Sequence, residues 1–284
     1  MDDRMNGKTV LVTGGTNGLG LATARGLARL GAQVTIISRD GDKCSRVAEA
    51  IKLEGGNPVD FIAADLSLLS GIRLAAESFR ERNKKLNVLV NNAGGIFNKR
   101  ILTPDGFEMT FALNHLNYFM LTNLLLDMLK SSAPARVINV ASGLHRNARL
   151  DFQNLQGENR YSGFGAYGQS KLANVLFSYE IARRLEHSGV TVNVVHPGYV
   201  NTGLSLNNGF FFRIFAGLSA RLFGRKPEEG AKTSIYLASS PNVEGVTGKY
   251  FVDCQPVDSS PESYDEARAK KFWDVSLELM GKGA

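Results

Sequence analysis

The sequence predicts an α/β fold, a single domain over residues 1–284 built on a doubly wound parallel sheet of about seven strands in the order 3-2-1-4-5-6-7. Short β-branched runs alternate with helical stretches along most of the chain. The first run leads into a glycine-rich turn and a helix, and polar residues follow several later runs. Because strand–helix alternation at this spacing implies right-handed crossovers, these observations favour an open sheet with helices on both faces.

The composition excludes several classes of protein. The chain has 284 residues, of which 43% are hydrophobic, enough to bury the core of one large domain. Its net charge of +6 comes from dispersed basic residues, with no run longer than Lys84–Lys85 or Lys270–Lys271, so no nucleic-acid partner is predicted. Cys44 and Cys254 have neither disulfide nor metal-site spacing, which predicts a reducing environment and no metal site.

The N-terminal residues bear on where the protein resides. Met1 to Arg4 are polar and lead directly into a strand, without the apolar run of a signal peptide. The chain nowhere has the uninterrupted apolar run, about eighteen residues or longer, of a transmembrane helix. We therefore expect a cytoplasmic protein, or one that touches a membrane surface through the segment at 204–223 described below.

A glycine-rich turn follows the first predicted strand, Lys8–Thr13, and precedes a predicted helix, Leu21–Leu30. Its glycine spacing is GxxxGxG. Strand, glycine turn and helix is the context in which the backbone approaches a pyrophosphate closely while the helix N-terminus favours its negative charge. The sequence therefore predicts a dinucleotide site at Gly14, Gly15, Thr16, Asn17, Gly18, Leu19 and Gly20.

The end of the second predicted strand, Gln33–Ser38, indicates which dinucleotide binds. An acidic side chain here would bind the ribose 2′-hydroxyl of NAD and repel a 2′-phosphate. Ser38 and Arg39 instead offer a hydroxyl and a guanidinium, which suit a phosphate, so NADP(H) is predicted in preference to NAD(H). The alternative is that Arg39 is a surface residue paired locally with Asp40.

Two further predicted strands end in polar residues at the same edge of the sheet. Ligands of doubly wound sheets lie outside the carboxyl ends of the strands, so these residues are expected to converge with the glycine turn. The residues expected to contact the dinucleotide from these strand ends are Asp65, Leu66, Asn92, Ala93 and Gly94.

A predicted helical stretch over 104–129 and the strand Ala135–Val140 after it carry three polar candidates. Asn114 and His115 lie among Leu, Phe and Met residues, and this local pattern favours a structural role for the amide and a packing role for the imidazole. Ser142 follows the strand, at the same edge as the glycine turn. No GxSxG elbow surrounds it, so a hydrogen-bonding role is predicted rather than nucleophilic attack.

Tyr167 and Lys171 are four positions apart in a predicted helix, Gly165–Glu186, and therefore lie on one face. A lysine cation beside a phenol favours the phenolate, so the tyrosine pKa is expected to fall from about 10 toward neutral and to suit proton exchange. Such a pair also occurs by chance on solvated helices. The other motifs of the chain are what favour an acid/base function.

The segment at 204–223 is a long apolar connection inside the predicted sheet, between a strand at Val190–Val195 and a helix that starts at Pro227. A connection of this length in a compact fold is usually functional, so we interpret it as a substrate cover. The alternative is an amphipathic segment that touches a membrane, which is compatible with a lipid-like substrate. A last strand at Gly248–Val252 and a largely polar helical tail at Ser260–Met280 are expected after it.

Together these motifs resemble those of the short-chain dehydrogenases/reductases along nearly the whole chain. The matching elements, in the family's order and approximate spacing, are Thr13–Gly20, Asp65–Leu66, Asn91–Gly94, Asn114, Ser142, Tyr167–Lys171 and Pro197–Gly198. Ser38–Asp40, Phe111–Leu116 and His196–Thr202 are most similar to the retinol dehydrogenase and WW-domain oxidoreductase branch. The resemblance implies a Rossmann-type fold with a cofactor half at about 5–140 and a catalytic and substrate half at about 141–284.

The resemblance also implies a catalytic tetrad of Asn114, Ser142, Tyr167 and Lys171. Tyr167 would exchange a proton with the substrate oxygen, and Lys171 would lower the tyrosine pKa and bind the nicotinamide ribose. Ser142 would hydrogen-bond the substrate oxygen and stabilise its developing charge. Asn114 would hold a water that links Lys171 to solvent. Hydride passes directly between the nicotinamide and the substrate carbon in this family, so no metal is expected.

The same resemblance extends to further contacts, to assembly and to function. The additional cofactor contacts that it implies are Tyr167, Lys171, Pro197, Gly198 and Thr202. A homodimer or homotetramer through the long fourth and fifth helices is expected. The predicted function is NADP(H)-dependent hydride transfer to or from a hydrophobic carbonyl or alcohol, such as a retinoid, a steroid or a lipid-like aldehyde or ketone. The alternative is a non-catalytic NADP(H)-binding sensor or adaptor.

Overall fold

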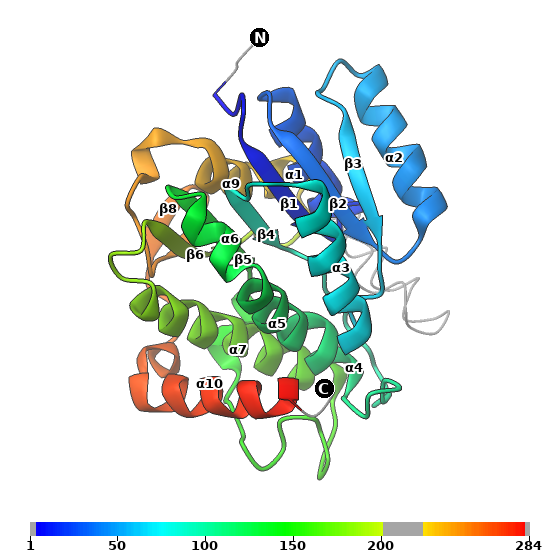
Figure 1. The fold of residues 1–284 in the computed structure, drawn as a ribbon. Helices are drawn as coiled ribbons and strands as arrows, with labels where there is room; N and C mark the ends of the chain where they lie inside the picture. Colours follow the sequence, from blue (N-terminus) through cyan, green and yellow to red (C-terminus); the bar gives the residue numbers. More distant parts are fainter. Residues whose placement is uncertain (1–3, 201–223, 282–284) are drawn as a thin grey trace.

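A computed structural model of the chain describes residues 4–200 and 224–281, which form three layers, with helices on both faces of one sheet (Figure 1). The sheet has the strand order β3-β2-β1-β4-β5-β6-β7-β8. The predicted doubly wound sheet and its order are confirmed, with one strand more than expected. The expected substrate cover at 204–223 lies outside the described residues, and so does Thr202.

The first seven strands pair in parallel, and only the last pairs antiparallel to its neighbour. In chain order the strands are β1 (Thr9–Thr13), β2 (Gln33–Ser38), β3 (Val59–Ala63), β4 (Val88–Asn91), β5 (Ala135–Val140), β6 (Val190–His196), β7 (Tyr250–Val252) and β8 (Gln255–Val257). The main helices are α1 (Gly18–Arg29), α2 (Gly41–Leu53), α3 (Leu69–Arg82), α5 (Asn117–Leu124), α6 (Leu126–Ser131), α7 (Gly163–Arg184), α9 (Pro227–Ser239) and α10 (Glu266–Gly281). Shorter turns are α4 (Met109–Phe111), η1 (Ala112–Leu116), η2 (Gly143–Asn147), η4 (Pro241–Val243) and η5 (Pro261–Tyr264).

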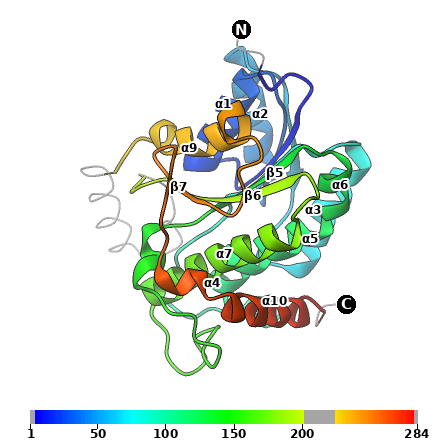
Figure 2. The ribbon, with the colours of Figure 1, turned by 90° about the vertical axis from the view of Figure 1, so that its left-hand side faces the viewer.

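Two apolar layers hold the helices on the sheet. Helices α1, α2 and α9 pack on one face, and α3, α5 and α7 pack on the other (Figures 1 and 2). All five residues of β1 are buried, because helices cover it on both sides. A strand buried on both faces needs apolar β-branched residues at successive positions, which is why these strands are recognisable in the sequence.

The eighth strand was not predicted from the sequence. β8 pairs with β7 across a two-residue turn, Asp253–Cys254, in which both residues have positive φ values of 49° and 63°. Its three residues are exposed and include Pro256. An exposed edge strand of this length has no alternation of apolar and polar residues, so the sequence carries no signal for it.

The predicted helical stretch over 104–129 begins later and is interrupted. It starts at Met109, continues through the π-helical turn η1 and ends its regular part at Leu124. Asn114 lies at the centre of η1, where its side chain bonds to the backbone of Gly95 on a neighbouring loop. A π-helical turn re-aims the side chains within it, so this interruption is what turns Asn114 toward that loop.

Helix α7 carries the Tyr167–Lys171 pair and spans 22 residues, two residues earlier than predicted at each end. Ser162 caps its first turn by accepting a hydrogen bond from the Gly165 backbone nitrogen at 3.3 Å.

Within residues 4–200 and 224–281, no helix is both long enough and apolar enough to cross a membrane.

The C-terminal helix α10 differs from the polar tail that was predicted. It lies along α7 in both ribbon views (Figures 1 and 2). Its Phe272 and Trp273 side chains are buried. Trp273 contacts Phe119 of α5 at 4.9 Å and Phe177 of α7 at 6.0 Å between ring centroids. α10 therefore covers part of the α5 and α7 surface that the family resemblance assigns to an interface between copies.

We predict that α10 contributes strongly to the free energy of unfolding. Truncating Trp273, which is 7% exposed, to alanine should lower it by about 3 to 5 kcal/mol, because a large aromatic side chain leaves a cavity between α5 and α7. Leu277 is 42% exposed on the same helix and is the matched control: its change to alanine should cost about 0.5 kcal/mol or less. Urea unfolding followed by circular dichroism measures both, and equal costs would contradict the packing role of Trp273.

Candidate active site

A large cavity lies outside the carboxyl ends of the strands, where the doubly wound topology predicts a ligand. Its volume is about 680 Å³. The turns after β1, β2, β3, β4, β5 and β6 all contribute to it, together with one face of α7. The predicted site residues that line it are Gly14, Thr16, Asn17, Gly18, Leu19, Gly20, Ser38, Arg39, Asp65, Leu66, Asn92, Ala93, Gly94, Ser142, Tyr167, Lys171, Pro197 and Gly198.

The glycine turn between β1 and α1 fits a pyrophosphate. A methyl group at Gly20 would overlap the Gly14 carbonyl oxygen and the Asn92 amide, so only glycine allows this approach of helix to strand. Asn92 Nδ2 donates to the Thr13 carbonyl oxygen at 2.8 Å and thereby ties the end of β4 to this turn. The first turn of α1 carries no acidic side chain, so the positive end of the helix dipole faces the cavity unopposed.

The end of β2 gathers two hydroxyls and two cations. Thr16 Oγ1 lies 3.1 Å from Ser38 Oγ, and Arg39 lines the cavity beside them. The Asp40 carboxylate caps α2 by accepting a hydrogen bond from the Lys43 backbone nitrogen at 2.9 Å, which gives Asp40 a role other than pairing with Arg39. Lys43 also lines the cavity and was missed in the sequence analysis. Its position four residues after Arg39, in the first turn of a helix, is the signal that could have found it.

Asp65 and Leu66 shape the turn between β3 and α3. The Asp65 carboxylate accepts hydrogen bonds from the Ser67 backbone nitrogen at 2.9 Å and from its hydroxyl at 2.7 Å. These bonds hold the turn at the cavity edge, where both residues lie. Asp65 therefore acts on the cavity wall through backbone geometry.

The Lys171 amine is buried beneath the centre of the cavity. Its Nζ donates a hydrogen bond to the Val140 carbonyl oxygen at 2.9 Å and lies 5.2 Å from the Tyr118 ring centroid and 5.6 Å from that of Tyr167. The residue is only 2% exposed, and this burial lowers the pKa of Lys171 to about 7. Its ammonium form is therefore in balance with the neutral amine near neutral pH.

The expectation that Lys171 lowers the pKa of Tyr167 does not hold in this structure. Burial raises the Tyr167 pKa to about 12, and the opposing influence is a hydrogen bond with the Ser142 side chain. The physical reason is desolvation, because a site that destabilises the ammonium also destabilises the phenolate. Two ionisable groups on one helix face were correctly placed together, but their shared burial could not be inferred from spacing.

Ser142 caps the short turn η2, and its hydroxyl also interacts with the phenol of Tyr167. The hydroxyl accepts a hydrogen bond from the Leu144 backbone nitrogen at 3.3 Å. Ser142 and Tyr167 come from strand β5 and helix α7, and both line the cavity. This arrangement places two hydroxyl groups together at the cavity surface, where they could hydrogen-bond one oxygen atom of a ligand.

Asn114 does not line the cavity but supports its wall. Its side-chain oxygen accepts from the Gly95 nitrogen at 2.8 Å, and its amide donates to the Gly95 carbonyl and to Ser170 Oγ, both at 3.0 Å. These contacts agree with the structural role that the local sequence pattern favours. Gly15 is likewise set back from the cavity, because it packs against the side chain of Ile36.

The mouth of the cavity is apolar, and sequence reasoning missed the residues that make it so. Leu144, Phe164 and Tyr199 all line the cavity while remaining 39%, 55% and 55% exposed. Phe97 and Leu113 lie deeper in the same wall. Exposed apolar side chains gathered at a cavity indicate a surface that binds an apolar ligand.

His196, at the end of β6, is a further lining residue that was not singled out. Burial lowers its pKa to about 4, and the nearby His145, Arg225 and Arg146 lower it further. Its Nδ1 is buried and has no hydrogen-bond partner among the residues that the structure describes. In the sequence, His196 is the first residue of the motif His196–Pro197–Gly198, of which only Pro197 and Gly198 were predicted to contact the cofactor.

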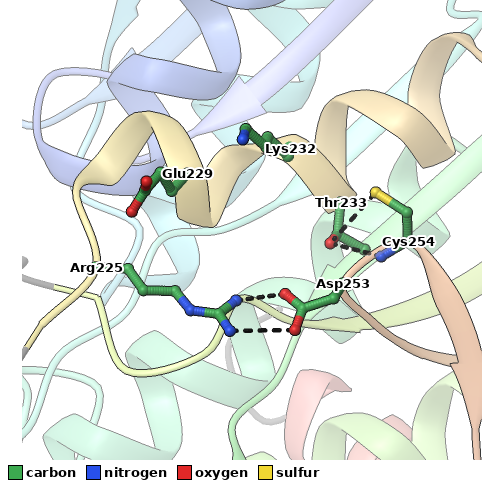
Figure 3. Close-up of a pocket in the computed structure, with 6 residues that line it drawn as sticks. All are labelled: Arg225, Glu229, Lys232, Thr233, Asp253 and Cys254. Atoms are coloured by element: carbon green, nitrogen blue, oxygen red, sulfur yellow. Dashed lines mark hydrogen bonds and ion pairs between the residues drawn. The ribbon is translucent and has the colours of Figure 1, made fainter.

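A second hollow of about 360 Å³ lies beside the β7–β8 turn and shares no lining residue with the large cavity (Figure 3). Arg225 pairs there with both carboxylate oxygens of Asp253. The Arg225 side chain also lies against Gly198, where a methyl group would approach its Cδ to 3.2 Å and where φ is +79°. The Arg225 nitrogen donates to the Tyr199 carbonyl oxygen at 2.7 Å. The Arg225–Asp253 pair therefore supports the turn at 197–199 from behind.

The fold and this site define an NAD(P)-dependent oxidoreductase. The family model described as short chain dehydrogenase matches residues 8–209. The chain belongs to the short-chain dehydrogenase family, as its motifs predicted.

Within that family the chain lies in the retinol dehydrogenase branch. It is 44% identical over 290 residues to mouse retinol dehydrogenase 14, covering 98% of this chain and 87% of that protein. It is 42% identical over 279 residues to human retinol dehydrogenase 11, with 98% and 87% coverage. Both relatives are matched along most of their length.

Solved structures agree with this assignment. A protein from Mycobacterium paratuberculosis superposes with a TM-score of 0.78 at 33% identity, covering 97% of this chain and 94% of that chain. RhlG of Pseudomonas aeruginosa, solved as an active-site complex with NADP, superposes with a TM-score of 0.70 at 30% identity, with 88% and 96% coverage. These likenesses support a nicotinamide cofactor.

We predict that the buried Lys171 makes stability depend on pH. Its pKa is about 7 when folded and near 10.5 when unfolded, so the unfolded chain binds the extra proton between these values and wild-type stability rises with pH across that window. Lys171→Met removes the titration. The variant should therefore gain on the order of a few kcal/mol over the wild type below pH 7, and this gain should shrink toward pH 10. Urea unfolding of both cofactor-free proteins at pH 6, 8 and 9.5 tests this, and a pH-independent difference would be inconsistent with it.

Proposed function

We propose that the protein is an NADP(H)-dependent oxidoreductase that interconverts a bulky apolar aldehyde or ketone and its alcohol. One observation carries this proposal. A single cavity joins an apolar mouth, the hydroxyls of Ser142 and Tyr167, and the cationic end of β2. Strands β1 and β4 separate the β2 end from the β5 end, so the cavity suits an elongated dinucleotide with its reactive ring at the tyrosine.

Four residues of this chain are assigned separate roles in the reaction. The nicotinamide supplies or accepts the hydride when the cofactor is bound. Tyr167 donates a proton to the carbonyl oxygen during reduction and removes one from the alcohol during oxidation. Ser142 donates a hydrogen bond to the same oxygen and stabilises its developing charge. Lys171 is assigned to the nicotinamide ribose, whose hydroxyls would accept hydrogen bonds from Nζ and favour its charged form. We assign Asn114 to holding the Gly94–Gly95 turn.

The preference for NADP(H) rests on the end of β2. Arg39 and Lys43 place two positive charges at the position that distinguishes a 2′-phosphate from a 2′-hydroxyl. Thr16 and Ser38 add hydroxyl groups beside them. Asp40 also lines the cavity, and its carboxylate caps α2 by accepting from the Lys43 backbone nitrogen. Asp65, Leu66 and the turn at Asn92–Gly94 would line the adenine and ribose portion, and Pro197, Gly198 and Thr202 the nicotinamide portion.

The substrate class follows from the apolar wall. Leu144, Phe164 and Tyr199 together offer a bulky surface next to the two catalytic hydroxyls. Such a surface suits a retinoid, a steroid or another lipid-like carbonyl compound, and the relatives in this branch are named retinol dehydrogenases. We also propose that the segment 204–223 covers the substrate; the alternative is that it contacts a membrane.

We further propose that the chain does not self-associate through the α5 and α7 surface. Phe272 and Trp273 of α10 already occupy part of it. A homodimer or homotetramer, which the family resemblance implies, would then form through another surface.

Replacing Tyr167 by Phe should lower turnover of an apolar aldehyde by about 10²- to 10⁴-fold, because it removes the positioned proton donor while keeping the ring. NADPH binding should be nearly unchanged. Tyr236, on α9, is a matched control, and Tyr236→Phe should retain activity. Steady-state NADPH consumption measures turnover, and fluorescence titration measures binding. Activity of Tyr167→Phe within tenfold of the wild type would refute the mechanism. A wild type that binds NADPH but turns over no carbonyl would favour the sensor alternative.

Arg39→Ala and Lys43→Ala should each weaken NADPH binding by about tenfold while leaving NADH binding little changed, since each loses a charged contact to phosphate. Lys52→Ala, an exposed change near the other end of α2, is the matched control and should alter neither affinity. The ratio of the two dissociation constants is the measured quantity. If that ratio stays the same in both variants, the cationic end of β2 does not select the cofactor.

A further inference from the structure

His145 is a buried histidine that the proposed mechanism does not use. It lies three residues after Ser142 in the turn η2 and has no exposed surface. Its Nδ1 is 2.7 Å from the Ser142 carbonyl oxygen, and its Nε2 is 3.1 Å from the Ser260 backbone nitrogen. One imidazole ring therefore bridges the peptide of the catalytic serine and a residue near the C-terminal helix.

The two partners determine the protonation of this ring. A backbone carbonyl only accepts hydrogen bonds, so Nδ1 must carry the proton that it donates to Ser142. A backbone N–H only donates, so Nε2 must be unprotonated in order to accept the hydrogen bond from the Ser260 nitrogen. Both nitrogens are thus satisfied only in the neutral Nδ1–H tautomer. A second proton on Nε2 would oppose the Ser260 N–H and break the bridge.

The surroundings of His145 keep it in that form. The Tyr250 ring of β7 packs against it at 4.9 Å between centroids, and the Tyr250 hydroxyl lies 3.5 Å from Nδ1, a longer contact than that to the Ser142 carbonyl. His196 of β6 and Arg146 of η2 are ionisable groups near the ring. Burial lowers the pKa of His145, and the charge of Arg146 lowers it further, whereas the hydrogen bond to Ser142 raises it. The ring is therefore neutral at physiological pH.

The far end of the bridge is itself well anchored. The Ser260 carbonyl oxygen accepts from the Ser263 nitrogen at 3.0 Å as the turn η5 begins. In the same turn, Glu262 accepts a hydrogen bond from the Leu150 nitrogen at 3.0 Å. The Arg146 guanidinium, next to His145, donates to the carbonyl oxygens of Asp258 and Ser259. The segment 258–264 is thus fastened to the loop that follows the catalytic serine at several points.

We propose that His145 is a positioning residue: it fixes the Ser142 peptide against the C-terminal segment 258–264 and thereby holds the Ser142 hydroxyl within reach of Tyr167 and the substrate oxygen. This inference rests on the proposed roles of Ser142 and Tyr167. The Ser142 carbonyl oxygen also accepts from the His145 backbone nitrogen at 3.2 Å, and the preceding Ala141 nitrogen donates to the Val195 carbonyl oxygen at 2.8 Å. The imidazole adds the contact that ties this turn to the segment 258–264. A displacement of about 1 Å at such a residue can cost about 10²-fold in rate.

The first test compares His145→Phe with His145→Asn. Phenylalanine keeps a planar ring but lacks both nitrogens, and it should lower kcat by about 10- to 100-fold with the KM for NADPH unchanged. Asparagine restores a donor near the Ser142 carbonyl and should recover most of the lost rate. Wild-type kcat in His145→Phe would overturn the proposal.

Arg146→Met is the matched control. It removes contacts to the same segment 258–259 but none to Ser142. Its melting temperature should fall, while kcat stays as in the wild type. If Arg146→Met reproduces the kinetic changes of His145→Phe, general support of the loop explains them and the specific role of His145 is refuted.

A double-mutant cycle separates positioning from any other effect. If His145 acts through Ser142, His145→Phe should cause no further loss of kcat in a Ser142→Ala background. The same fold-loss in both backgrounds would overturn the inference.

A measurement without turnover keeps the inference separate from the proposed function. His145 is one of four histidines, so nitrogen-15 NMR of the imidazoles can assign its tautomer in the wild-type protein. We expect the Nδ1–H form at neutral pH, because the Ser142 carbonyl can only accept and the Ser260 N–H can only donate. An Nε2–H tautomer would refute the bridge even in a protein without detectable activity. Absence of carbonyl turnover with an intact Nδ1–H bridge would instead count against the proposed function.

Discussion

The burial of one amine is the constraint on which the active site depends. Lys171 points its Nζ into a space closed by the Val140 carbonyl and by the rings of Tyr118 and Tyr167. A charged group in such a place is costly unless it is paired, so the lysine is balanced between its two forms and the tyrosine is held neutral. Any ligand that offers oxygen acceptors to Nζ relieves this cost. The charged form of Lys171 therefore lacks hydrogen-bond acceptors in this site, and the ribose hydroxyls of a cofactor could supply them.

Behind this amine, a chain of buried amides and hydroxyls connects the layers of the fold. Asn91 of β4 donates to Asn139 of β5 at 2.8 Å, and Asn139 donates to Ser178 of α7 at 2.8 Å. One turn earlier on α7, Asn174 donates to the Asn114 carbonyl oxygen at 2.9 Å. The Asn91 Oδ1 is buried without a partner among the described residues, but the donors and acceptors named here are paired. A shift of α7 would break these pairs and leave buried polar groups unsatisfied. The network thus fixes α7, and with it Tyr167 and Lys171, relative to the sheet.

The C-terminal part of the chain acts on the same site from the other side. His115 in the π-helical turn approaches Ser276 of α10 at 3.0 Å, just as His145 reaches Ser260. Each of these buried histidines is close in sequence to a residue that the family resemblance assigns to the site, Asn114 or Ser142. Residues far from the cavity in sequence therefore bear on its geometry, and α10 also covers helix surface that would otherwise face solvent.

The sequence by itself determined the features that local chemistry encodes: the alternation of strands and helices, the strand order, the glycine turn, and the polar residues at strand ends such as Asp65, Asn92 and Ser142. It could do so because buried parallel strands need apolar β-branched runs and because parallel topology brings their carboxyl ends together. Only the tertiary structure decided the π-helical turn at Asn114, the inward face of α10, the contribution of Lys43 and Leu144 to the cavity, and the raised pKa of Tyr167. These depend on what surrounds each residue, since desolvation and packing are set by neighbours that lie far away in the chain.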